Sequence, residues 1–596
     1  MGKRRSLSYI TIIMFMVMNK EIRYALEYHE ATKHSEASLM TSRHYLDFDN
    51  KPIPFKIYLE LPSITLPTNF PTPEANALSC ISGMISLTPY KDKERFTATS
   101  SKDTLTSTSK LGIENLAEIL YFSAGITREM KYPNGNYYMR AASATGALYP
   151  IESYLVCDDV SPNLMAGVYH FSPGDFSLIQ IRKGSYKRYL ADTANNQDIA
   201  RAPITIIFTS FAWRNAWKYQ ARSYRHWFWD AGVIAANLLA TTRAMGLPAR
   251  ITLGFLDDSV NQLLCLEDQK EAVIAMAVIG TGLSNDNIAP SQQQEQINEL
   301  SHASIPKIRP LSKRGEFKYP EIWQLNQASK LTSKQEIEEW ISNAHNHHHL
   351  VLPKTLIYSQ GKGTNDDNLI ITFNKLKDSI TNSFTLRETI LRRGSSRRFA
   401  RTNISLSTLK TILYASTRGV PMDIFEDGNS LIDIYFIANG VDSLDPGGYF
   451  YNRDASTSPG DPTNFLKKTS GIANSRNISG YLCLGQSLFG DASAVFFLMT
   501  DLQSVLKSLG NRGYRACQFE AGIIAGKIYL AAYALGIGAS GSTFFDDAVT
   551  EFFSPHASDK STMIAIGIGV PAYKASPGKI LLPRLSREQL LTQDFG

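Results

Sequence analysis

Three polar side chains alternate along one short segment in the last third of the chain. Residues 391–400 read LRRGSSRRFA, and within them Arg393, Ser395 and Arg397 stand two residues apart. On an extended backbone alternate side chains point the same way, so two guanidinium groups and one hydroxyl would converge. Arginine offers planar, bidentate donors that suit a phosphate group. The pattern predicts a phosphate grip, a name we keep for these three residues; the alternative is an exposed basic stretch.

A second set of small side chains precedes a predicted strand in the first half of the chain. Residues 140–156 read RAASATGALYPIESYLV. Ser143, Thr145 and Gly146 would let the backbone approach a flat ligand closely and donate hydrogen bonds to it. We call residues 143–146 the ring loop. The alternative interpretation is an ordinary turn that leads into a strand.

Lys218 and Tyr219 form the third candidate, an adjacent pair of proton-transfer groups. They lie in the stretch WKYQARSYR, and four tryptophans are close in sequence: Trp213, Trp217, Trp227 and Trp229. An aromatic surround lowers the pKa of a lysine by desolvation, which moves it toward a useful catalytic range. A surface dipeptide is the alternative interpretation of such a pair.

The elements that must position these side chains occur twice. Residues 222–246 (RSYRHWFWDAGVIAANLLATTRAMG) and 512–536 (RGYRACQFEAGIIAGKIYLAAYALG) align without gaps. Both predict a long helix that ends at a glycine and carries an Ala-Gly pair where another helix can approach closely. An Arg-x-Tyr-Arg motif recurs in both copies, which favours a structural role for its members: Arg222, Tyr224, Arg225, Arg512, Tyr514 and Arg515.

Further blocks repeat in the same order along the chain. Residues 116–127 match 409–420 upstream of the long helix. Downstream, FLDDSV matches FFDDAV, where aspartates can cap a short helix, and a buried-strand pattern follows each of them at 272–280 and 562–570. The chain is therefore a duplicated domain of mixed helices and strands.

Length and composition limit the function classes. At 596 residues the chain exceeds one hydrophobic core, and with 43% apolar and 19% charged residues it resembles an ordinary soluble protein. The net charge of +6 suits an anionic cofactor or substrate, and without long basic blocks it does not argue for nucleic acid. Five scattered cysteines form no CxxC pair, so neither a disulfide framework nor a zinc site is indicated, and the cytoplasm is the expected location.

Two segments fall outside the repeated blocks. Residues 1–23 are predicted as an N-terminal extension whose apolar run, 9–18, is too short to span a bilayer and lacks a cleavage site, so no membrane association is expected; a mis-assigned translation start is an alternative. Residues 286–375 are predicted as a polar linker with some helix, such as around 337–341. The linker holds four histidines without a completing cysteine or carboxylate pattern, so a solvated loop and no metal site are expected: His345, His347, His348 and His349.

Together these motifs resemble the nitroreductase superfamily. The RxSxRxF motif (393–399), the SATGALYP segment (143–150) and KY-x3-SYR before a D/E-A-G helix are similar to its SagB/ThcOx branch. That branch contains the azoline dehydrogenases of thiazole- and oxazole-modified peptide pathways. The segment YHEATKHS (28–35) is similar to the opening segment common in the branch, and the resemblance covers most of 24–285 and 380–575.

The resemblance implies an α+β fold that normally dimerises, with FMN at the interface. One subunit supplies the phosphate grip, and the other supplies the ring loop and the residues over the flavin face. In the azoline dehydrogenases an adjacent Lys-Tyr pair is implicated as the catalytic base, which here is Lys218 and Tyr219. The backbone of Ser542 and Thr543 matches a flavin contact. C-terminal Lys579 or Arg584 is a further candidate for a phosphate contact.

The two halves differ in what they retain. Carrying the alignment back from Leu116 and Leu409 places Ser100 opposite Arg393 and Thr104 opposite Arg397, so the first half lacks the grip. The counterparts of the ring loop and of the Lys-Tyr pair are also changed in the second half: an acidic stretch around Glu426 and Asp427, and Ser508 with Leu509. One complete site for one FMN therefore forms between domain 1 (24–285) and domain 2 (376–596), an intramolecular pseudo-dimer that can be a monomer.

The leading hypothesis is an FMN-dependent dehydrogenase that acts on an azoline or similar ring in a modified peptide or natural product. A cyclodehydratase or another subunit of a modification complex is the partner that this hypothesis suggests. Two alternatives remain open. One is a flavin reductase that uses NAD(P)H on nitro, quinone or ene substrates, and the other is a non-catalytic partner in a peptide-modification complex.

Overall fold

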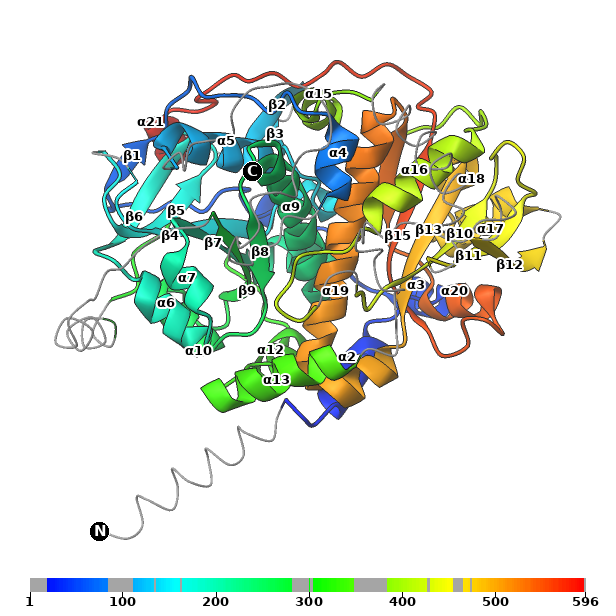
Figure 1. The fold of residues 1–596 in the computed structure, drawn as a ribbon, viewed down its shortest axis with the longest axis horizontal. Helices are drawn as coiled ribbons and strands as arrows, with labels where there is room; N and C mark the ends of the chain where they lie inside the picture. Colours follow the sequence, from blue (N-terminus) through cyan, green and yellow to red (C-terminus); the bar gives the residue numbers. More distant parts are fainter. Residues whose placement is uncertain are drawn as a thin grey trace, which may run out of the picture.

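The computed structural model describes ten stretches of the chain: 19–83, 111–132, 135–160, 163–280, 300, 304–347, 383–425, 429–453, 465–471 and 474–593. In these stretches two sheets flank a central pair of long helices (Figure 1). The first sheet has the strand order β1-β6-β5-β4-β7-β9-β8, and the second has β12-β11-β10-β13-β15-β14. Apart from β1, the two sheets have equivalent strand orders, because β6-β5-β4-β7-β9-β8 corresponds strand by strand to β12-β11-β10-β13-β15-β14. The duplication predicted from the sequence is confirmed.

All paired strands within the two sheets are antiparallel. The strands of the first sheet are β1 (Ser63–Thr65), β4 (Ile151–Cys157), β5 (Gly167–Ser172), β6 (Ser177–Lys183), β7 (Ile204–Phe211), β8 (Ala249–Thr252) and β9 (Glu271–Ile279). Those of the second sheet are β10 (Asp433–Ala438), β11 (Gly447–Tyr451), β12 (Leu466–Gly471), β13 (Ala494–Thr500), β14 (Gly538–Ser542) and β15 (Ser561–Gly569). A separate hairpin pairs β2 (Ile126–Tyr132) with β3 (Gly135–Arg140).

Helices cover both sheets and flank the centre. Those of the first half are α4 (Ala77–Ser82), α5 (Ile113–Ala124), α6 (Lys187–Thr193), α7 (Gln197–Arg201), α8 (Ala212–Tyr219), α9 (Ser223–Ala244) and α10 (Asp257–Leu263). Those of the second half are α15 (Leu386–Arg392), α16 (Leu406–Ser416), α17 (Ser475–Leu482), α18 (Ser487–Asp491), α19 (Leu502–Ala534), α20 (Asp546–Phe553) and α21 (Arg587–Thr592). The remaining helices are α2 (Arg23–Ala31), α3 (Glu36–Thr41), α12 (Pro320–Ala328) and α13 (Lys334–Asn346), with short 3-10 turns at Phe48–Asn50, Thr145–Ala147 and Gln220–Arg222.

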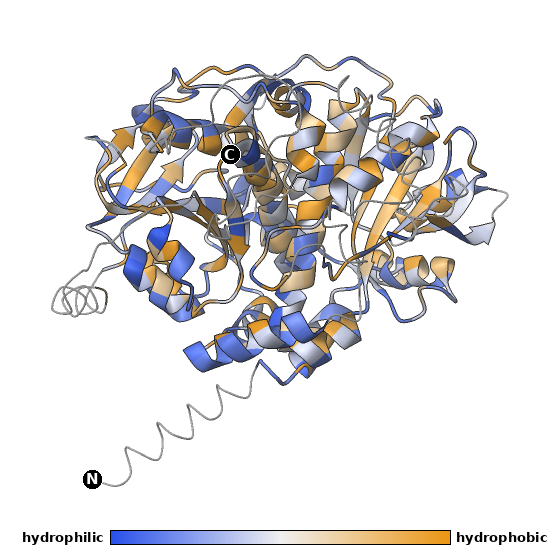
Figure 2. Ribbon diagram, in the orientation of Figure 1, coloured by the Kyte–Doolittle hydropathy of each residue, from blue (hydrophilic) through white to orange (hydrophobic). Residues whose placement is uncertain are grey.

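The hydrophobic core follows the predicted strand patterns. Strand β9 is buried along its whole length, and β15 is buried at every residue after its first. Figure 2 shows apolar residues concentrated on the strands, whereas the outer helix α13 is mainly hydrophilic. Among the described helices none combines the length and the apolar character that crossing a bilayer requires.

The central helices α9 and α19 touch where the sequence carries its Ala-Gly pairs. A Cβ atom added to Gly232 would lie 2.6 Å from the Phe519 carbonyl oxygen, and one added to Gly522 would lie 2.7 Å from the Trp229 carbonyl oxygen. Such distances exclude any side chain, so only glycine permits this approach. The close helix crossing predicted from the small residues is confirmed, and it joins the two halves.

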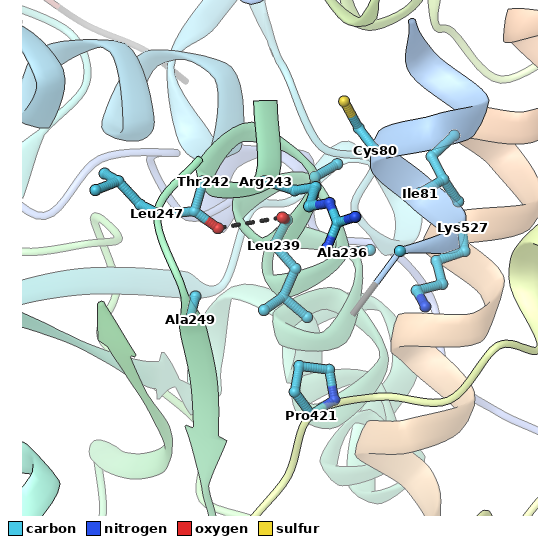
Figure 3. Close-up of a pocket in the computed structure, with 12 residues that line it drawn as sticks. Cys80, Ile81, Ala236, Leu239, Thr242, Arg243, Leu247, Ala249, Pro421 and Lys527 are labelled. Carbon is cyan, nitrogen blue, oxygen red and sulfur yellow. Dashed lines mark hydrogen bonds between the residues drawn. The ribbon is translucent and has the colours of Figure 1, made fainter. Parts of the chain in front are cut away.

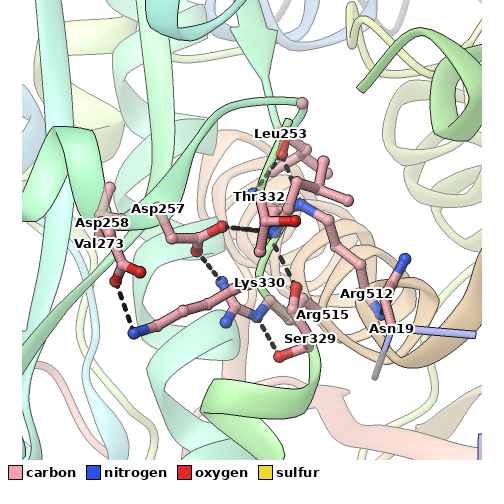
Figure 4. Close-up of polar contacts among 12 residues, drawn as sticks. Asn19, Leu253, Asp257, Asp258, Val273, Ser329, Lys330, Thr332, Arg512 and Arg515 are labelled. Atoms are coloured by element: carbon pink, nitrogen blue, oxygen red, sulfur yellow. Dashed lines mark hydrogen bonds and ion pairs between the residues drawn. The ribbon is translucent and has the colours of Figure 1, made fainter. Parts of the chain in front are cut away.

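The repeated arginines brace the halves across this crossing. Arg512 and Arg515 of α19 both pair with Asp257 of the first half, each at 2.6 Å (Figure 4). The mirror contact pairs Arg222 and Arg225 with Asp546 at 2.9 and 2.7 Å. All of these side chains are buried. The structural role predicted for the repeated motif is confirmed.

The aspartates of the repeated FLDDSV and FFDDAV blocks do not cap their helices, contrary to the sequence-based expectation. The N-cap positions are Leu256 and Phe545, and neither provides a side-chain cap. Asp257 and Asp546 stand one residue later and accept hydrogen bonds from arginines of the opposite half. Both carboxylates therefore form ion pairs with guanidinium groups, and neither helix has a side-chain cap.

Part of the predicted polar linker is packed structure. The helix expected around 337–341 is present as α13, and α12 precedes it. Residues 327–330 (QASK) occupy the place that residues 30–33 (EATK) occupy in the first half. The pairing of Lys330 with Asp258 at 2.7 Å is mirrored by that of Lys33 with Asp547 at 2.7 Å. The opening segment is therefore duplicated as well, whereas the domain boundaries at 285 and 375 stay predictions.

The solvated loop predicted for the linker histidines is wrong for the two that the structure describes. His345 lies in the last turn of α13 and contacts the Asp423 carbonyl oxygen at 3.1 Å, and His347 contacts the Ser508 hydroxyl at 2.7 Å. Both imidazoles therefore attach α13 to the second half. His348 and His349 lie outside the described residues.

Candidate active site

The ring loop is held by a buried carboxylate of the central helix α9. The backbone N–H and the hydroxyl of Thr145 both donate to one carboxylate oxygen of Asp230, each at 2.8 Å. The Asn215 amide donates to the other oxygen at 3.3 Å. Gly146 follows with a φ of +64°, a conformation that favours glycine. Ser143 and Asp230 line one small cavity beneath the loop.

Tyr219 at the end of α8 reaches the ring loop. A Cβ atom added to Gly146 would lie 2.7 Å from the Tyr219 hydroxyl oxygen, so glycine leaves room for the phenol at this point. The other side of the phenol ring meets His226 edge-on, with 4.6 Å between ring centroids. The structure therefore brings the ring loop and one member of the Lys-Tyr pair into contact.

Arg393 crosses from the second half to the backbone just before the ring loop. Its guanidinium group donates to the carbonyl oxygens of Ala141 and Arg140, each at 2.7 Å. Arg128 of β2 makes the reverse crossing and donates to the carbonyl oxygens of Leu391 and Arg392, each at 3.0 Å. The start of the phosphate grip and the start of the ring loop are thus tied together across the two halves.

Ser395 and the end of β14 share one partner, Tyr529 of α19. The hydroxyl groups of Ser395 and Tyr529 lie 3.4 Å apart, and the Gly541 N–H donates to the same phenol oxygen at 2.5 Å. The next residues along the chain are Ser542 and Thr543. Ser542 accepts a hydrogen bond from the Gln486 amide at 3.0 Å, and the buried Thr543 hydroxyl has no partner among the described residues.

Lys218 and Arg397 come from opposite halves, and the charge of Arg397 acts on Lys218. Partial burial and the nearby Arg397 guanidinium lower the pKa of Lys218. The Lys218 ammonium group also lies 5.3 Å from the centre of the Tyr219 ring. The direction of the lysine shift agrees with the sequence-based expectation, although the second cause is a cation rather than an aromatic surround.

Tyr219 shifts in the opposite direction from its neighbour. Burial and the Asp230 carboxylate raise the pKa of Tyr219 well above its usual range. At neutral pH the phenol therefore keeps its proton and acts as a hydrogen-bond donor, whereas the lowered pKa of Lys218 enlarges its neutral, basic fraction. The pair divides into a donor and an acceptor of protons.

The residues present fit a flat ligand with an anionic tail. Arg128, Arg393, Arg397 and Lys218 gather at this junction, and no carboxylate lies within ion-pair distance of any of them in the described stretches. Like charges repel, so a bound phosphate would relieve the mutual repulsion of these cations. Such a ligand would lie between the two halves. The first half would contribute the tight space at Gly146, and the second half would contribute the unpartnered Thr543 hydroxyl.

The pseudo-symmetric position in the molecule has different residues wherever the structure describes it. Ala77 N–H donates to the Phe384 carbonyl oxygen and Leu386 N–H donates to that of Ala75, which makes α4 the counterpart of α15. Asn76 and Thr385 pair with each other just before the two helices, so equivalent residues of the two halves differ in number by 309 (385 − 76) here. By this offset in numbering Arg393 corresponds to Met84 rather than to Ser100, and both Met84 and Ser100 lie outside the described residues. The residues from 83 to 88, GMISLT, still contain no arginine.

A pocket marks this second position (Figure 3). It is lined by residues from the end of α4, the last turns of α9 and the start of β8, together with Pro421 and Lys527. Lys527 is buried and donates to the Gly419 carbonyl oxygen at 2.8 Å, and burial lowers its pKa to about 8. The expected acidic counterpart of the ring loop, Glu426 and Asp427, lies outside the described residues.

Several contributors to the first site escaped the sequence analysis. Asp230 and Tyr529 hold the site together through contacts with residues more than eighty positions away, and the Tyr573 hydroxyl accepts a hydrogen bond from the Arg397 backbone N–H at 3.0 Å. Both long helices carry an acidic residue at the same position, Asp230 in α9 and Glu520 in α19. This repetition in the sequence could have indicated the role of Asp230. Arg584, a candidate phosphate contact, donates instead to the Thr127 and Lys579 carbonyl oxygens.

Comparisons with known proteins agree with this duplicated architecture. The sequence model described as Nitroreductase family matches residues 113–281 and 457–569, once in each half. A crystal structure of a nitroreductase from Anabaena variabilis superposes with a TM-score of 0.63 at 22% identity, covering 92% of this chain and 99% of that chain. This likeness shows the fold. The chain belongs to the nitroreductase family, with one copy of the domain in each half, and is a nitroreductase-family oxidoreductase.

One curated relative is distantly similar in sequence. The trifolitoxin-processing protein TfxB of Rhizobium leguminosarum bv. trifolii is 27% identical over 178 residues. The match spans 29% of this chain and 48% of that protein, so the chain covers about half of the relative's length.

Proposed function

We propose that the protein is an FMN-dependent dehydrogenase that oxidises an azoline or similar ring in a modified peptide or natural product. The observation that carries this proposal is the Tyr219 hydroxyl against Gly146 of the ring loop, next to Lys218, on which the charge of Arg397 from the other half acts. The residues proposed to hold the phosphate and those proposed to transfer the proton thus come from opposite halves. The motif resemblance and the relative named as a processing protein support a modified peptide as substrate.

Each residue has a distinct task in this proposal. Arg393, Ser395 and Arg397 bind the phosphate of FMN, while the ring loop (Ser143, Thr145 and Gly146) and the backbone of Ser542 and Thr543 enclose its ring system. FMN supplies a hydride acceptor when it is bound. Lys218 removes the acidic proton from the substrate carbon, and the Tyr219 hydroxyl orients the substrate by donating a hydrogen bond.

A synthetic peptide that carries one thiazoline ring tests the direction of the reaction. We expect the FMN-loaded protein to convert the ring to a thiazole in air, which mass spectrometry detects as the loss of two hydrogen atoms. The FMN-free protein is the control and should leave the peptide unchanged. Rapid bleaching of the flavin by NADPH, with reduction of a quinone and no change in the peptide, would favour a reductive enzyme instead. A protein that takes up no FMN would support a non-catalytic role in a modification complex.

A further inference from the structure

Asp230 is a buried carboxyl group that the proposed chemistry does not yet use. Its side chain is 3% exposed, and no arginine or lysine forms an ion pair with it in the described stretches. Its partners are instead neutral donors, the Thr145 N–H, the Thr145 hydroxyl and the Asn215 amide. Burying an unpaired carboxyl is costly. A purely structural anchor at this position could be an uncharged amide.

The contacts of Asp230 lead directly to Tyr219. Thr145 is bonded to Asp230, and the next residue, Gly146, meets the Tyr219 hydroxyl. The backbone after Thr145 is unusual, because Gly146, Ala147 and Tyr149 all have positive φ values of 64°, 54° and 51°. Non-glycine residues adopt such angles only when surrounding contacts hold them there. The two hydrogen bonds to Asp230 are such contacts.

The ionisable groups around Asp230 are few. Tyr219 of α8 and Tyr149, just before β4, both feel the charge of Asp230, and Arg140 at the end of β3 lines the same cavity. His226 lies one turn earlier on α9, and burial lowers its pKa well below the usual range, so it is neutral. Burial raises the pKa of Asp230 to about 7. Among these neighbours, Asp230 is the group that changes charge near neutral pH.

We propose that Asp230 is a positioning residue whose carboxylate form holds the ring loop against the Tyr219 hydroxyl more firmly than its acid form. A charged acceptor makes stronger hydrogen bonds than a neutral one, so ionisation tightens both bonds from Thr145. The loop then fixes Gly146, and with it the place where Tyr219 meets the substrate and the flavin. The effect of Asp230 on catalysis rests on the proposed function, whereas its effect on the order of the ring loop does not.

The second half provides a matched control. Glu520 occupies the equivalent place on α19, where it accepts hydrogen bonds from the Ser430 hydroxyl at 2.5 Å and the Leu431 N–H at 2.8 Å. Burial raises its pKa to about 7 as well. Leu509 stands where the first half has Tyr219, so the same carboxyl in the second half has no proton-transfer group to position.

Hydrogen–deuterium exchange of residues 144–148 in the FMN-free protein tests the loop directly. After correction for intrinsic exchange, we expect protection in the wild type to rise as the pH increases through about 7, because Asp230 then loses its proton. Asp230→Asn keeps the shape and one acceptor but has no charge, so its protection should not change with pH. Glu520→Gln should retain the wild-type profile. An Asn variant with the wild-type profile would overturn the proposal.

Stability and turnover separate positioning from folding. Burial raises the folded-state pKa of Asp230 although the two Thr145 hydrogen bonds lower it, so global stability is highest at low pH and falls as the pH rises to about 7, while the two loop bonds themselves strengthen. Asp230→Asn should therefore melt no lower than the wild type at pH 8, with unchanged FMN content, yet turn over the thiazoline peptide about tenfold more slowly, equivalent to roughly 1.4 kcal/mol. Equal turnover in the two proteins would refute the catalytic consequence. A wild type that binds no FMN would refute the proposed function and leave the exchange result standing.

Discussion

Tyr219→Phe and Lys218→Ala are expected to retain bound FMN and to lose most turnover of the thiazoline peptide. Removing one positioned proton-transfer group typically costs about 10²- to 10⁴-fold in rate. Phenylalanine preserves the ring that packs on His226 and removes only the hydroxyl that meets Gly146. Because Lys218 acts as the base, we expect wild-type turnover to rise with pH as its ammonium group loses a proton. Flavin absorbance and steady-state rates measure the two effects separately.

The second half again offers a control for this pair. Ser508 stands at the position equivalent to Lys218, and its hydroxyl contacts only His347 among the described residues. Ser508→Ala should therefore leave both FMN content and turnover near the wild-type values. Full activity in Tyr219→Phe and Lys218→Ala would exclude the pair from the reaction.

Arg393→Ala is expected to lose FMN and to destabilise the protein. Its guanidinium group bonds two carbonyl oxygens of the opposite half, and the substitution leaves both without that donor in a buried place. An unsatisfied buried acceptor costs about 1–3 kcal/mol, so the free energy of unfolding should fall by roughly 3 kcal/mol. Urea unfolding and equilibrium dialysis with FMN measure the two losses.

Arg397→Ala separates binding from folding at the same grip. Its side chain is exposed, so stability should stay unchanged while the dissociation constant for FMN rises about tenfold or more, as expected for one charge-assisted contact. Arg398→Ala and Arg392→Ala are matched neighbours with exposed side chains and should bind FMN normally. Unchanged FMN affinity in both Arg393→Ala and Arg397→Ala would contradict the phosphate grip.

Local patterns were sufficient to predict much of the fold. The long helices, the strands β9 and β15 and the Gly232–Gly522 crossing follow from periodicity and small residues, which act over a few positions. The structural role of the Arg-x-Tyr-Arg motif followed from its repetition in two halves. These features depend on neighbours in the sequence or on comparison of one half with the other.

Long-range contacts account for what the sequence did not indicate. Asp230 binds the ring loop across 85 positions, and Tyr529 meets Ser395 across 134. The helix α12 was not recognised as a counterpart of α2 because the two helices share almost no residues at matching positions, although Lys330 and Lys33 make equivalent ion pairs. The equivalence of α4 and α15 depends on the pairing of their first residues across the two halves. Only the folded chain brings such residues together.

The amount of FMN bound per chain shows whether the two halves form one complete site. After loading with excess FMN and removal of the unbound flavin, the protein is denatured and the released flavin is measured by absorbance against protein concentration. The complementary residues of the two halves predict one FMN per chain. Two FMN per chain would contradict a single site, because the second position, where Leu509 replaces Tyr219 and residues 83–88 provide no arginine, would then bind flavin as well.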